Sequence, residues 1–294
     1  SAGTGFIGGT NGVQLQFSNN APPSVVADNG QQSFPVIVQA QNQGEQSVAA
    51  SNATITLEGF SYEAFNKSQG DLVKPPAENI PANRQTPDGD TIDAAPVFTE
   101  FPDFNYVNNV QAGYETAMIA RMCYEYGSTT SSELCIRDDM LTADSDTPCA
   151  VSGNRQTSSS GAPVRITGVE QEVSTSDRTL LSFTVQNQGS GQASETGTTC
   201  DPGQGERTAG NVVVQFSGLS GVTEFDCRGH EELGPRRYRL RMSQNDLQQG
   251  DSFTCDLTIP EENRNNREEP FNVELSYLYE TSTSKTLTVR NNPE

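Results

Sequence analysis

Residues 122–139 have the sequence MCYEYGSTTSSELCIRDD, and residues 275–292 have the sequence LSYLYETSTSKTLTVRNN. The two stretches align without a gap, and six of the 18 positions are identical. The identical positions include two tyrosines spaced two residues apart, Tyr124 and Tyr126 in the first copy. A repeat of this length predicts that one structural unit is encoded twice.

Two shorter blocks recur in the same order and support the duplication. Residues 41–44 and 186–189 both read QNQG, and residues 52–61 share Asn, Gly and Ser with residues 211–220 at matching places. At 294 residues, two domains of about 140 residues each would be close to the usual domain size. The sequence therefore predicts two copies of one domain type in tandem.

Apolar and polar residues alternate with period two in many short runs, which Gly, Asn and Pro separate. Long helical patterns are hard to find. The pattern predicts an all-β chain of two tandem immunoglobulin-like antiparallel β-sandwich domains with an extended N-terminal segment. The expected strands are 12–17, 34–41, 53–60, 96–107, 115–126, 132–137, 163–172, 179–186, 211–217, 236–242, 252–259, 271–280 and 285–290.

Composition predicts the domain boundaries. A glycine-rich tail at 1–11 precedes a first domain at 12–150, and a Ser, Gly and Thr stretch at 151–162 is expected to link it to a second domain at 163–294. Residues 67–95 contain four prolines and an Asp-Gly pair, so we expect a long surface loop there.

The chain is strongly acidic, with 38 acidic residues against 18 basic ones and a formal net charge of -20. Such a field repels nucleic acid and anionic lipid, so neither is expected as a partner. No apolar run approaches the roughly 20 residues that span a bilayer, so no membrane span is expected. An acidic, lysine-poor surface also fits a salty habitat, where ions screen the repulsion.

Several features predict an extracellular or cell-surface protein. The chain begins at Ser1 without Met, which we interpret as a mature form whose leader has been removed. Six cysteines fit an oxidising compartment, and Asn52 and Asn66 begin Asn-x-Thr and Asn-x-Ser triplets that predict glycan attachment.

The repeat suggests one disulfide. Cys123 aligns with Ser276 and Cys135 aligns with Thr288, so the second copy lacks both cysteines together, as expected of a bonded pair. The Gly-Ser-Thr-Thr-Ser stretch between the two cysteines predicts a hairpin turn that would bring them face to face. We therefore expect a Cys123–Cys135 bridge.

The other cysteines leave alternatives open. Cys227 and Cys255 fall on neighbouring strand regions and are expected to pair, while a Cys149–Cys200 bond would join the two domains. With three cysteines in each domain, at least one must bond across domains, bond another molecule or stay free. No C-x-x-C occurs and His230 is the only histidine, so zinc is not expected.

The sequence shows no catalytic constellation. His230 lies in Cys-Arg-Gly-His-Glu-Glu and is expected to be an exposed loop residue rather than the base of a triad. The glycines at 5–9 precede the first strand and lack a lysine, so they do not form a phosphate loop. We expect a protein that is not an enzyme and requires no cofactor. A calcium-dependent hydrolase is another functional class to consider, but the sequence offers no identifiable catalytic residues for it.

The best candidate for a metal site is the acidic loop between Cys135 and Cys149. Four carboxylates within nine residues supply the oxygen ligands that calcium prefers, and the alternative is a solvated loop without metal. A smaller acidic group lies at 88–93. The candidate calcium ligands are Asp138, Asp139, Asp144 and Asp146.

Tyrosines could form a sugar-binding platform, but the paired tyrosines recur with period two, which favours buried packing on one face of a strand. The candidates are Tyr106, Tyr114, Tyr124, Tyr126, Tyr277 and Tyr279.

The N-terminal segment predicts self-assembly. A flexible tail with an apolar tip, ahead of a β-sandwich, can leave its own domain and complete the sheet of a neighbour. A head-to-tail contact of this kind does not close and therefore grows a filament. The alternative is a disordered remnant of the leader. The expected assembly residues are Phe6, Ile7, Val13, Leu15 and Phe17.

The Asn-x-Gly pattern after a strand, in VQAQNQGEQ and FTVQNQGSG, resembles CARDB-like and related immunoglobulin-like modules of secreted prokaryotic proteins. GTGFIGGTNGVQLQF, APPSVV, the paired CYEY and ELCI, and GAPVRITGVE resemble a group of secreted archaeal tandem-domain surface proteins. This resemblance implies a structural role outside the cell, such as that of a pilus-like filament subunit. The alternative is a monomeric adhesion or carbohydrate-binding module, which would have an exposed aromatic groove and a mobile N-terminus.

Overall fold

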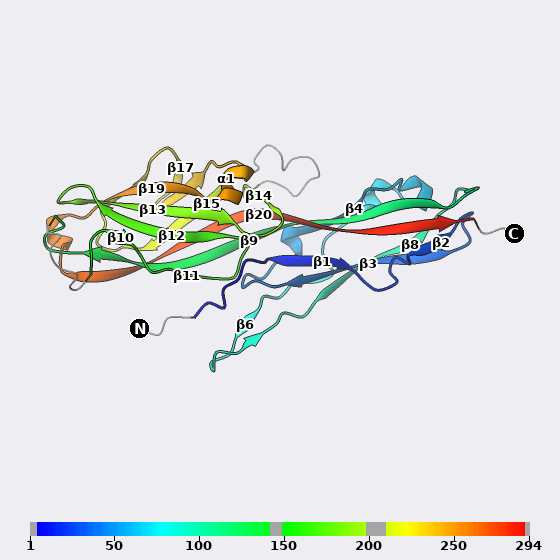
Figure 1. Ribbon diagram of the computed structural model, residues 1–294, viewed down its shortest axis with the longest axis horizontal. Helices are drawn as coiled ribbons and strands as arrows, with labels where there is room; N and C mark the ends of the chain where they lie inside the picture. Colours follow the sequence, from blue (N-terminus) through cyan, green and yellow to red (C-terminus); the bar gives the residue numbers. More distant parts are fainter. Residues whose placement is uncertain (1–4, 142–148, 198–209, 292–294) are drawn as a thin grey trace. The chain divides into compact units, whose positions relative to one another are not determined.

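The computed structural model describes residues 5–141, 149–197 and 210–291 (Figure 1). The chain forms two compact units. Unit 1 comprises Ser1–Asn11 and Tyr126–Leu278, and unit 2 comprises Gly12–Glu125 and Tyr279–Glu294. Each unit therefore combines residues from both of the domains expected at 12–150 and 163–294.

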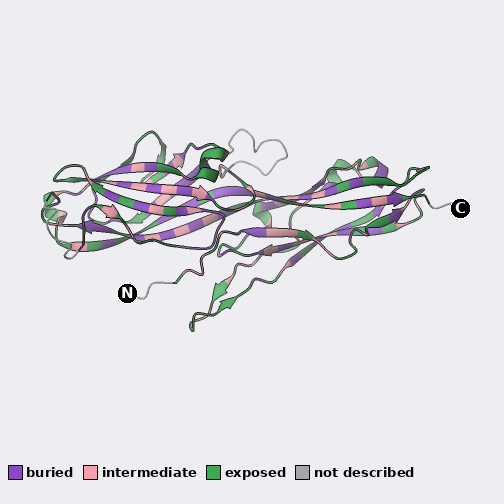
Figure 2. Ribbon diagram, in the orientation of Figure 1, coloured by how far each residue is buried: buried purple, intermediate pink, exposed green. Residues whose placement is uncertain are grey.

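The predicted all-β fold of antiparallel sheets is confirmed. In the described part of the chain the one α-helix is α1 (Gln244–Gln249), which Ser243 caps with its side chain. Buried and exposed residues alternate along the strands, as expected for sheets with one face toward a core (Figure 2). Among these residues no helix has the length and apolar character needed to cross a bilayer.

Unit 2 contains two larger sheets besides the two-stranded β6–β7 sheet. One has the strand order β1-β3-β8, and in the other β20 lies between β2 and β9, followed by β4 and β5. The predicted loop at 67–95 carries a 3-10 helix at Gln69–Leu72, β5 and the small β6–β7 hairpin. The strands are β1 (Val13–Phe17), β2 (Val25–Ala27), β3 (Ser33–Asn42), β4 (Ala53–Glu58), β5 (Val73–Lys74), β6 (Arg84–Gln85), β7 (Thr91–Ile92), β8 (Val97–Asn105), the first half of β9 (Tyr114–Ile136) and the second half of β20 (Arg267–Arg290).

Unit 1 is built in the same way. One sheet has the order β10-β12-β13-β19-β16, and the other contains β17-β18-β15-β20-β9, with β11 paired to β9. It uses the other halves of β9 and β20. Its own strands are β10 (Gly153–Asn154), β11 (Ser158–Ser159), β12 (Val164–Val173), β13 (Arg178–Asn187), β14 (Gln192–Ser194), β15 (Val212–Gly218), β16 (Glu224–Cys227), β17 (Glu231–Gly234), β18 (Arg237–Leu240) and β19 (Asp251–Thr258).

The QNQG blocks form the same turn in both units. In unit 2 the Asn42 side chain donates to Gln46 O at 2.6 Å and accepts from Gly44 N at 3.0 Å. In unit 1 the Asn187 side chain donates to Gly191 O at 2.8 Å and accepts from the amide two residues later at 3.1 Å. Both asparagines are buried, so the motif recurs because it satisfies the backbone at the end of an equivalent strand.

The repeated tyrosines also occupy equivalent places. Tyr124 accepts a hydrogen bond from Val13 N at 2.9 Å in unit 2. Tyr277 accepts one from Val164 N at 3.2 Å and donates one to Val164 O at 3.1 Å in unit 1. Each hydroxyl therefore satisfies the main chain at the first residue of a strand, Val13 of β1 or Val164 of β12.

The predicted hairpin turn at 127–131 is wrong, and so is the break expected between strands 271–280 and 285–290, because these residues continue β9 and β20 as single strands of 23 and 24 residues. The polar stretch of β9 is not a turn, since its alternate residues Ser128, Thr130 and Ser132 are buried, and the last two find hydrogen-bond partners there. Thr130 Oγ1 lies 2.8 Å from Ser159 Oγ, and Ser132 Oγ donates to Gln156 O at 2.9 Å. The segment 151–162, expected as a linker, supplies these partners, with Ser159 in β11 and Gln156 just before it.

One consequence is that the two repeats exchange strand halves. The body of unit 2, Gly12–Glu125, is completed by residues from the second copy of the repeat, and the body of unit 1 by Tyr126–Ile136 from the first copy. Within unit 2 the rings of Tyr124 and Tyr279 lie 6.0 Å apart, and within unit 1 those of Tyr126 and Tyr277 lie 6.3 Å apart.

Candidate functional site

The N-terminal segment lies against unit 1. Gly9 O accepts a hydrogen bond from Ala162 N at 3.4 Å, just after β11. Gly8 and Gly9 have φ angles of 78° and 113°, which favour glycine. Phe6 and Ile7 are half-buried. The apolar tip of the tail is therefore seated on protein rather than extended into solvent.

The other three candidate assembly residues belong to unit 2. Val13, Leu15 and Phe17 lie in β1, an edge strand whose residues pair with Val38–Asn42 of β3. Val13 is 1% exposed, and its amide is held by Tyr124. The structure thus separates the five residues into a tail, Phe6 and Ile7, and an edge strand that is anchored in its own sheet.

The disulfide expected between Cys123 and Cys135 is wrong, because Cys135 bonds Cys149 with a Cα–Cα distance of 5.8 Å. Cys123 and Cys135 are 12 positions apart on one continuous strand, which corresponds to roughly 40 Å along β9. Cys123 is itself disulfide-bonded. Cys200, the expected partner of Cys149, lies outside the described residues. The expected Cys227–Cys255 bridge is confirmed, between residues paired directly across β16 and β19.

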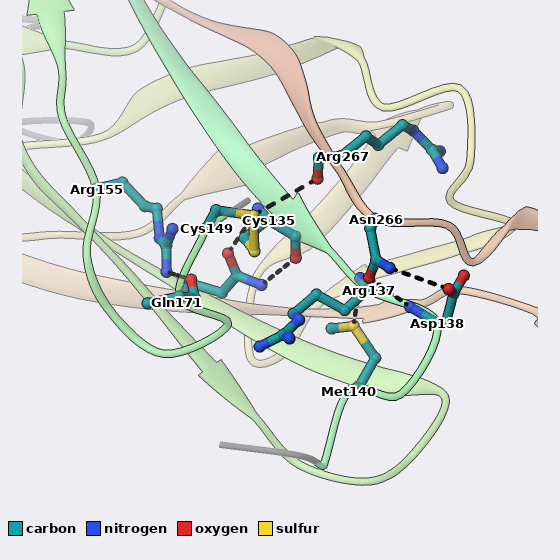
Figure 3. The surroundings of a disulfide bond; sticks show 10 residues. Cys135, Arg137, Asp138, Met140, Cys149, Arg155, Gln171, Asn266 and Arg267 are labelled. Carbon is teal, nitrogen blue, oxygen red and sulfur yellow. Dashed lines mark hydrogen bonds between the residues drawn. A yellow bond between two sulfur atoms is a disulfide. The ribbon is translucent and has the colours of Figure 1, made fainter. Parts of the chain in front are cut away.

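The surroundings of the Cys135–Cys149 bond fix the end of β9 (Figure 3). The fully buried side chain of Gln171 accepts from Cys135 N at 3.0 Å and donates to Cys135 O at 2.8 Å. Arg155 donates to Ala150 O, and burial lowers the pKa of this guanidinium. The tip of β9 is therefore held by one covalent bond and by a side-chain amide that takes the place of a neighbouring strand.

Two of the candidate calcium ligands can be placed. Asp138 accepts from Asn266 Nδ2 at 3.1 Å, and its amide donates to Asn266 Oδ1 at 3.3 Å (Figure 3). Asp139 accepts from Leu141 N at 3.0 Å. Asp144 and Asp146 lie outside the described residues. Within the described ranges no three metal-ligating side chains come together. The calcium site stays a prediction.

His230 is not the exposed loop residue that the sequence predicts. It is half-buried, its ring meets Phe253 edge-on at 5.8 Å, and burial lowers its pKa. It borders a cavity of about 340 Å³, where Arg228 donates to the buried Asp256 at 2.5 Å. The cavity is lined by Leu180, Arg228, His230, Ser252, Phe253, Thr254 and Asp256.

Both candidate glycosylation residues are exposed. Asn52 Nδ2 donates to Glu125 Oε2 at 2.5 Å, and Asn66 ends a short 3-10 helix with a φ of 54°. Both residues lie on the surface at the end of a short 3-10 helix, and glycan attachment requires such exposure.

The preference for buried tyrosine packing is confirmed. Tyr106, Tyr124, Tyr126, Tyr277 and Tyr279 are each at most 6% exposed. The exception among the six candidates is Tyr114, which is 42% exposed. These side chains therefore serve the cores of the units and do not form a common aromatic platform.

Sequence reasoning missed an ion-pair cluster in unit 2. Arg121 of β9 contacts Glu58 of β4 at 2.5 Å and Glu280 of β20 at 2.6 Å. The hydrogen bond with Glu58, followed by that with Glu280, raises the pKa of Arg121 despite partial burial. The sequence signal for this cluster was an arginine among apolar residues in an alternating strand. Its carboxylate partners could not be identified, because they lie on strands far away in the sequence.

A second missed carboxylate is buried in unit 1. Burial raises the pKa of Glu269, but hydrogen bonds from Arg267, Gly221 N and Ser220 lower it more, so the net shift is downward. The Arg267 guanidinium donates at 2.7 Å and the Ser220 hydroxyl at 2.9 Å. This group fixes the loop after β15 against the start of β20.

No protein-family model and no curated protein matches the chain. Among solved structures, the collagen binding domain of Erysipelothrix rhusiopathiae surface protein RspB aligns over 95% of this chain and 89% of its own, with 8% identity and a TM-score of 0.10. At that TM-score the likeness carries no argument. The resemblance to secreted archaeal surface proteins stays a prediction.

Proposed function

We propose that this chain is a structural subunit of an extracellular filament or cell-surface layer, and that its N-terminal segment links one copy to the next by β-strand donation. The observation that carries the proposal is the seat of the tail on unit 1. Phe6 and Ile7 are half-buried there, while the main chain of Gly9 bonds Ala162. An identical seat on a second copy offers the same contacts to the same segment.

The division between tail and edge strand sets the limits of the donated segment. Val13, Leu15 and Phe17 keep β1 in its own sheet, so the donated part ends before Gly12. Gly8 and Gly9 supply the flexible backbone that a change of partner requires. A donor that leaves one copy for the next makes a head-to-tail contact, and such contacts continue into a filament.

The surroundings fit a protein outside the cell. Two described disulfides are typical of oxidising compartments, and two exposed glycosylation triplets lie on unit 2. The net charge of -20 opposes close association at low ionic strength, so assembly should improve as salt screens it. The alternative of a sugar-binding module finds no support in the tyrosines, since five of the six candidates are buried.

Negative-stain electron microscopy tests the proposal. The wild-type chain should form ordered filaments, and the double variant Phe6→Ala, Ile7→Ala should remain dispersed. The matched control is Phe98→Ala, Ile92→Ala, which removes the same two side-chain types from positions 51% and 55% exposed on unit 2. The control should assemble normally. Dispersed wild-type particles at all salt concentrations, or filaments from the tail variant, would contradict the proposal.

A further inference from the structure

Residues 279–290, the second half of β20, complete unit 2 and are called the exchange arm below. Alternate side chains of the arm enter the core of unit 2, where Leu287 and Val289 are fully buried and Tyr279 is 3% exposed. The arm lies beside β9 in its sheet, and its last residues, Thr288–Arg290, also pair with β2. Unit 2 therefore lacks part of its core and one strand until an arm is in place.

The bonds that hold the arm are non-covalent and repeat along its length. Glu280 pairs with Arg121 at its start. Near its end, Val25–Ala27 of β2 pair in parallel with Thr288–Arg290, and Thr288 N donates to Ser24 O at 2.9 Å. Every one of these contacts is encoded by the arm and by the body of unit 2, so the arm of any copy can make them.

The equivalent half of β9 is held differently. Tyr126–Ile136 completes unit 1, and the Cys135–Cys149 disulfide ties its tip to that unit. Thr288 stands at the repeat position of Cys135, and the arm contains no cysteine. Of these two strand halves, the arm is therefore the one that can leave its unit without breaking the Cys135–Cys149 bond or an equivalent of it.

The two strand halves are copies of one repeat, and so are the two bodies that accept them. In this chain each body is already completed by a half-strand from the other repeat rather than by its own. Acceptance of a strand from a distant part of the sequence is thus the rule in this fold. A fold that exchanges strands within one chain can exchange them between chains with the same contacts.

We propose that the exchange arm is shared between copies, so that the arm of one chain completes unit 2 of a second copy of this chain. The inference rests on the proposed function in that copies bind one another, and it adds a second donor strand to the N-terminal segment. Together the tail and the arm give each copy two distinct contacts, one through unit 1 and one through unit 2.

Cysteine cross-linking of the full chain tests the arm. Val25 and Thr288 are directly paired, so a Val25→Cys chain and a Thr288→Cys chain are co-expressed and oxidised. A shared arm yields a covalent heterodimer, and its peptide map joins position 25 of one chain to position 288 of the other. The control combines Val25→Cys with Thr167→Cys, an exposed strand position of unit 1, and should lack this cross-link. Ala27→Cys with Arg290→Cys provides a second pair if the first variants fold poorly.

The double variant Val25→Cys, Thr288→Cys in a single chain separates the two proposals. An internal cross-link locks the arm in its own unit, and assembly should then be lost. Filaments built from internally locked chains, or co-expressed variants without a 25–288 heterodimer, overturn the exchange of the arm and leave tail donation standing. If the 25–288 heterodimer forms but the wild-type chain forms no filaments, the exchange of the arm is supported and the proposed function is overturned instead.

Discussion

Replacing Tyr277 by Phe removes one hydroxyl and keeps the ring, so its effect on stability follows from the main-chain groups of Val164 that lose their hydrogen-bond partner. Gln188 N donates to Pro163 O at 2.8 Å, which makes residues 163 and 188, next to the ends of β12 and β13, a hydrogen-bonded pair. The next pair, Val164 and Asn187, is therefore non-hydrogen-bonded, and both polar groups of Val164 point away from β13. The Tyr277 hydroxyl satisfies the two groups at 3.2 and 3.1 Å.

The variant leaves a buried amide and a buried carbonyl unsatisfied, because Val164 and Tyr277 are both 0% exposed. Each unsatisfied group costs about 1–3 kcal/mol. We expect a loss of about 2–4 kcal/mol in the free energy of unfolding, since local relaxation recovers part of the sum. For a unit of roughly 160 residues, such a loss lowers the melting temperature by about 4–16 °C.

Urea denaturation followed by circular dichroism, together with calorimetry, measures this loss. Tyr124→Phe should destabilise unit 2 by at least about 1 kcal/mol, because it orphans the amide of Val13. Tyr114→Phe is the matched control at a ring 42% exposed and should stay within about 0.5 kcal/mol of wild type. A Tyr277→Phe protein as stable as the control would refute the account of the repeated tyrosines as backbone partners.

Three further outcomes follow from single contacts. The fold lowers the pKa of Glu269, so its carboxylate stabilises the protein fully above the unfolded-state pKa of about 4.3. This stabilisation is lost as the pH falls below that value and through the folded-state pKa. In urea titrations from pH 6 to about 3, the Glu269→Gln variant should therefore lose less stability than the wild type. Replacing both Cys135 and Cys149 by Ala opens a bridge of sequence separation 14 and should cost about 3 kcal/mol in calorimetry. Gly127→Ala places a Cβ 2.6 Å from a backbone oxygen of β20 and should cost about 1–3 kcal/mol in urea denaturation, whereas Gly234→Ala, with open space around it, should be neutral.

The regular strands could be predicted because local alternation determines them. Predicted runs such as 34–41, 53–60 and 179–186 match β3, β4 and β13 to within two residues at each end. The QNQG motif was also informative, since its asparagine must satisfy a turn at the end of a strand wherever it occurs. Short strands such as β2 and β11 were missed, because two or three residues carry no period.

The continuity of β9 could not be predicted from its own residues. Gly127–Ser132 is rich in turn formers, and a Ser-Thr tract is equally compatible with a turn and with a strand that finds hydroxyl partners. The partners are Gln156–Ser160, which the sequence offered only as a linker. Once the strand is continuous, the assumption that each repeat closes on itself fails, and the expected Cys123–Cys135 bridge fails with it.

The joint absence of both cysteines from the second copy then has a different cause. Cys135 and Thr288 occupy the same place in two exchanged strand halves, and each tip needs something on its outer side. In unit 1 that place is taken by the bond to Cys149 and by Gln171, whereas in unit 2 it is taken by the parallel strand β2. A disulfide at position 288 would fix the second tip as firmly as the first. Its replacement by ordinary strand pairing leaves the tip in unit 1 held by a covalent bond and the tip in unit 2 held by hydrogen bonds, and the proposed sharing of the arm requires this asymmetry between equivalent positions.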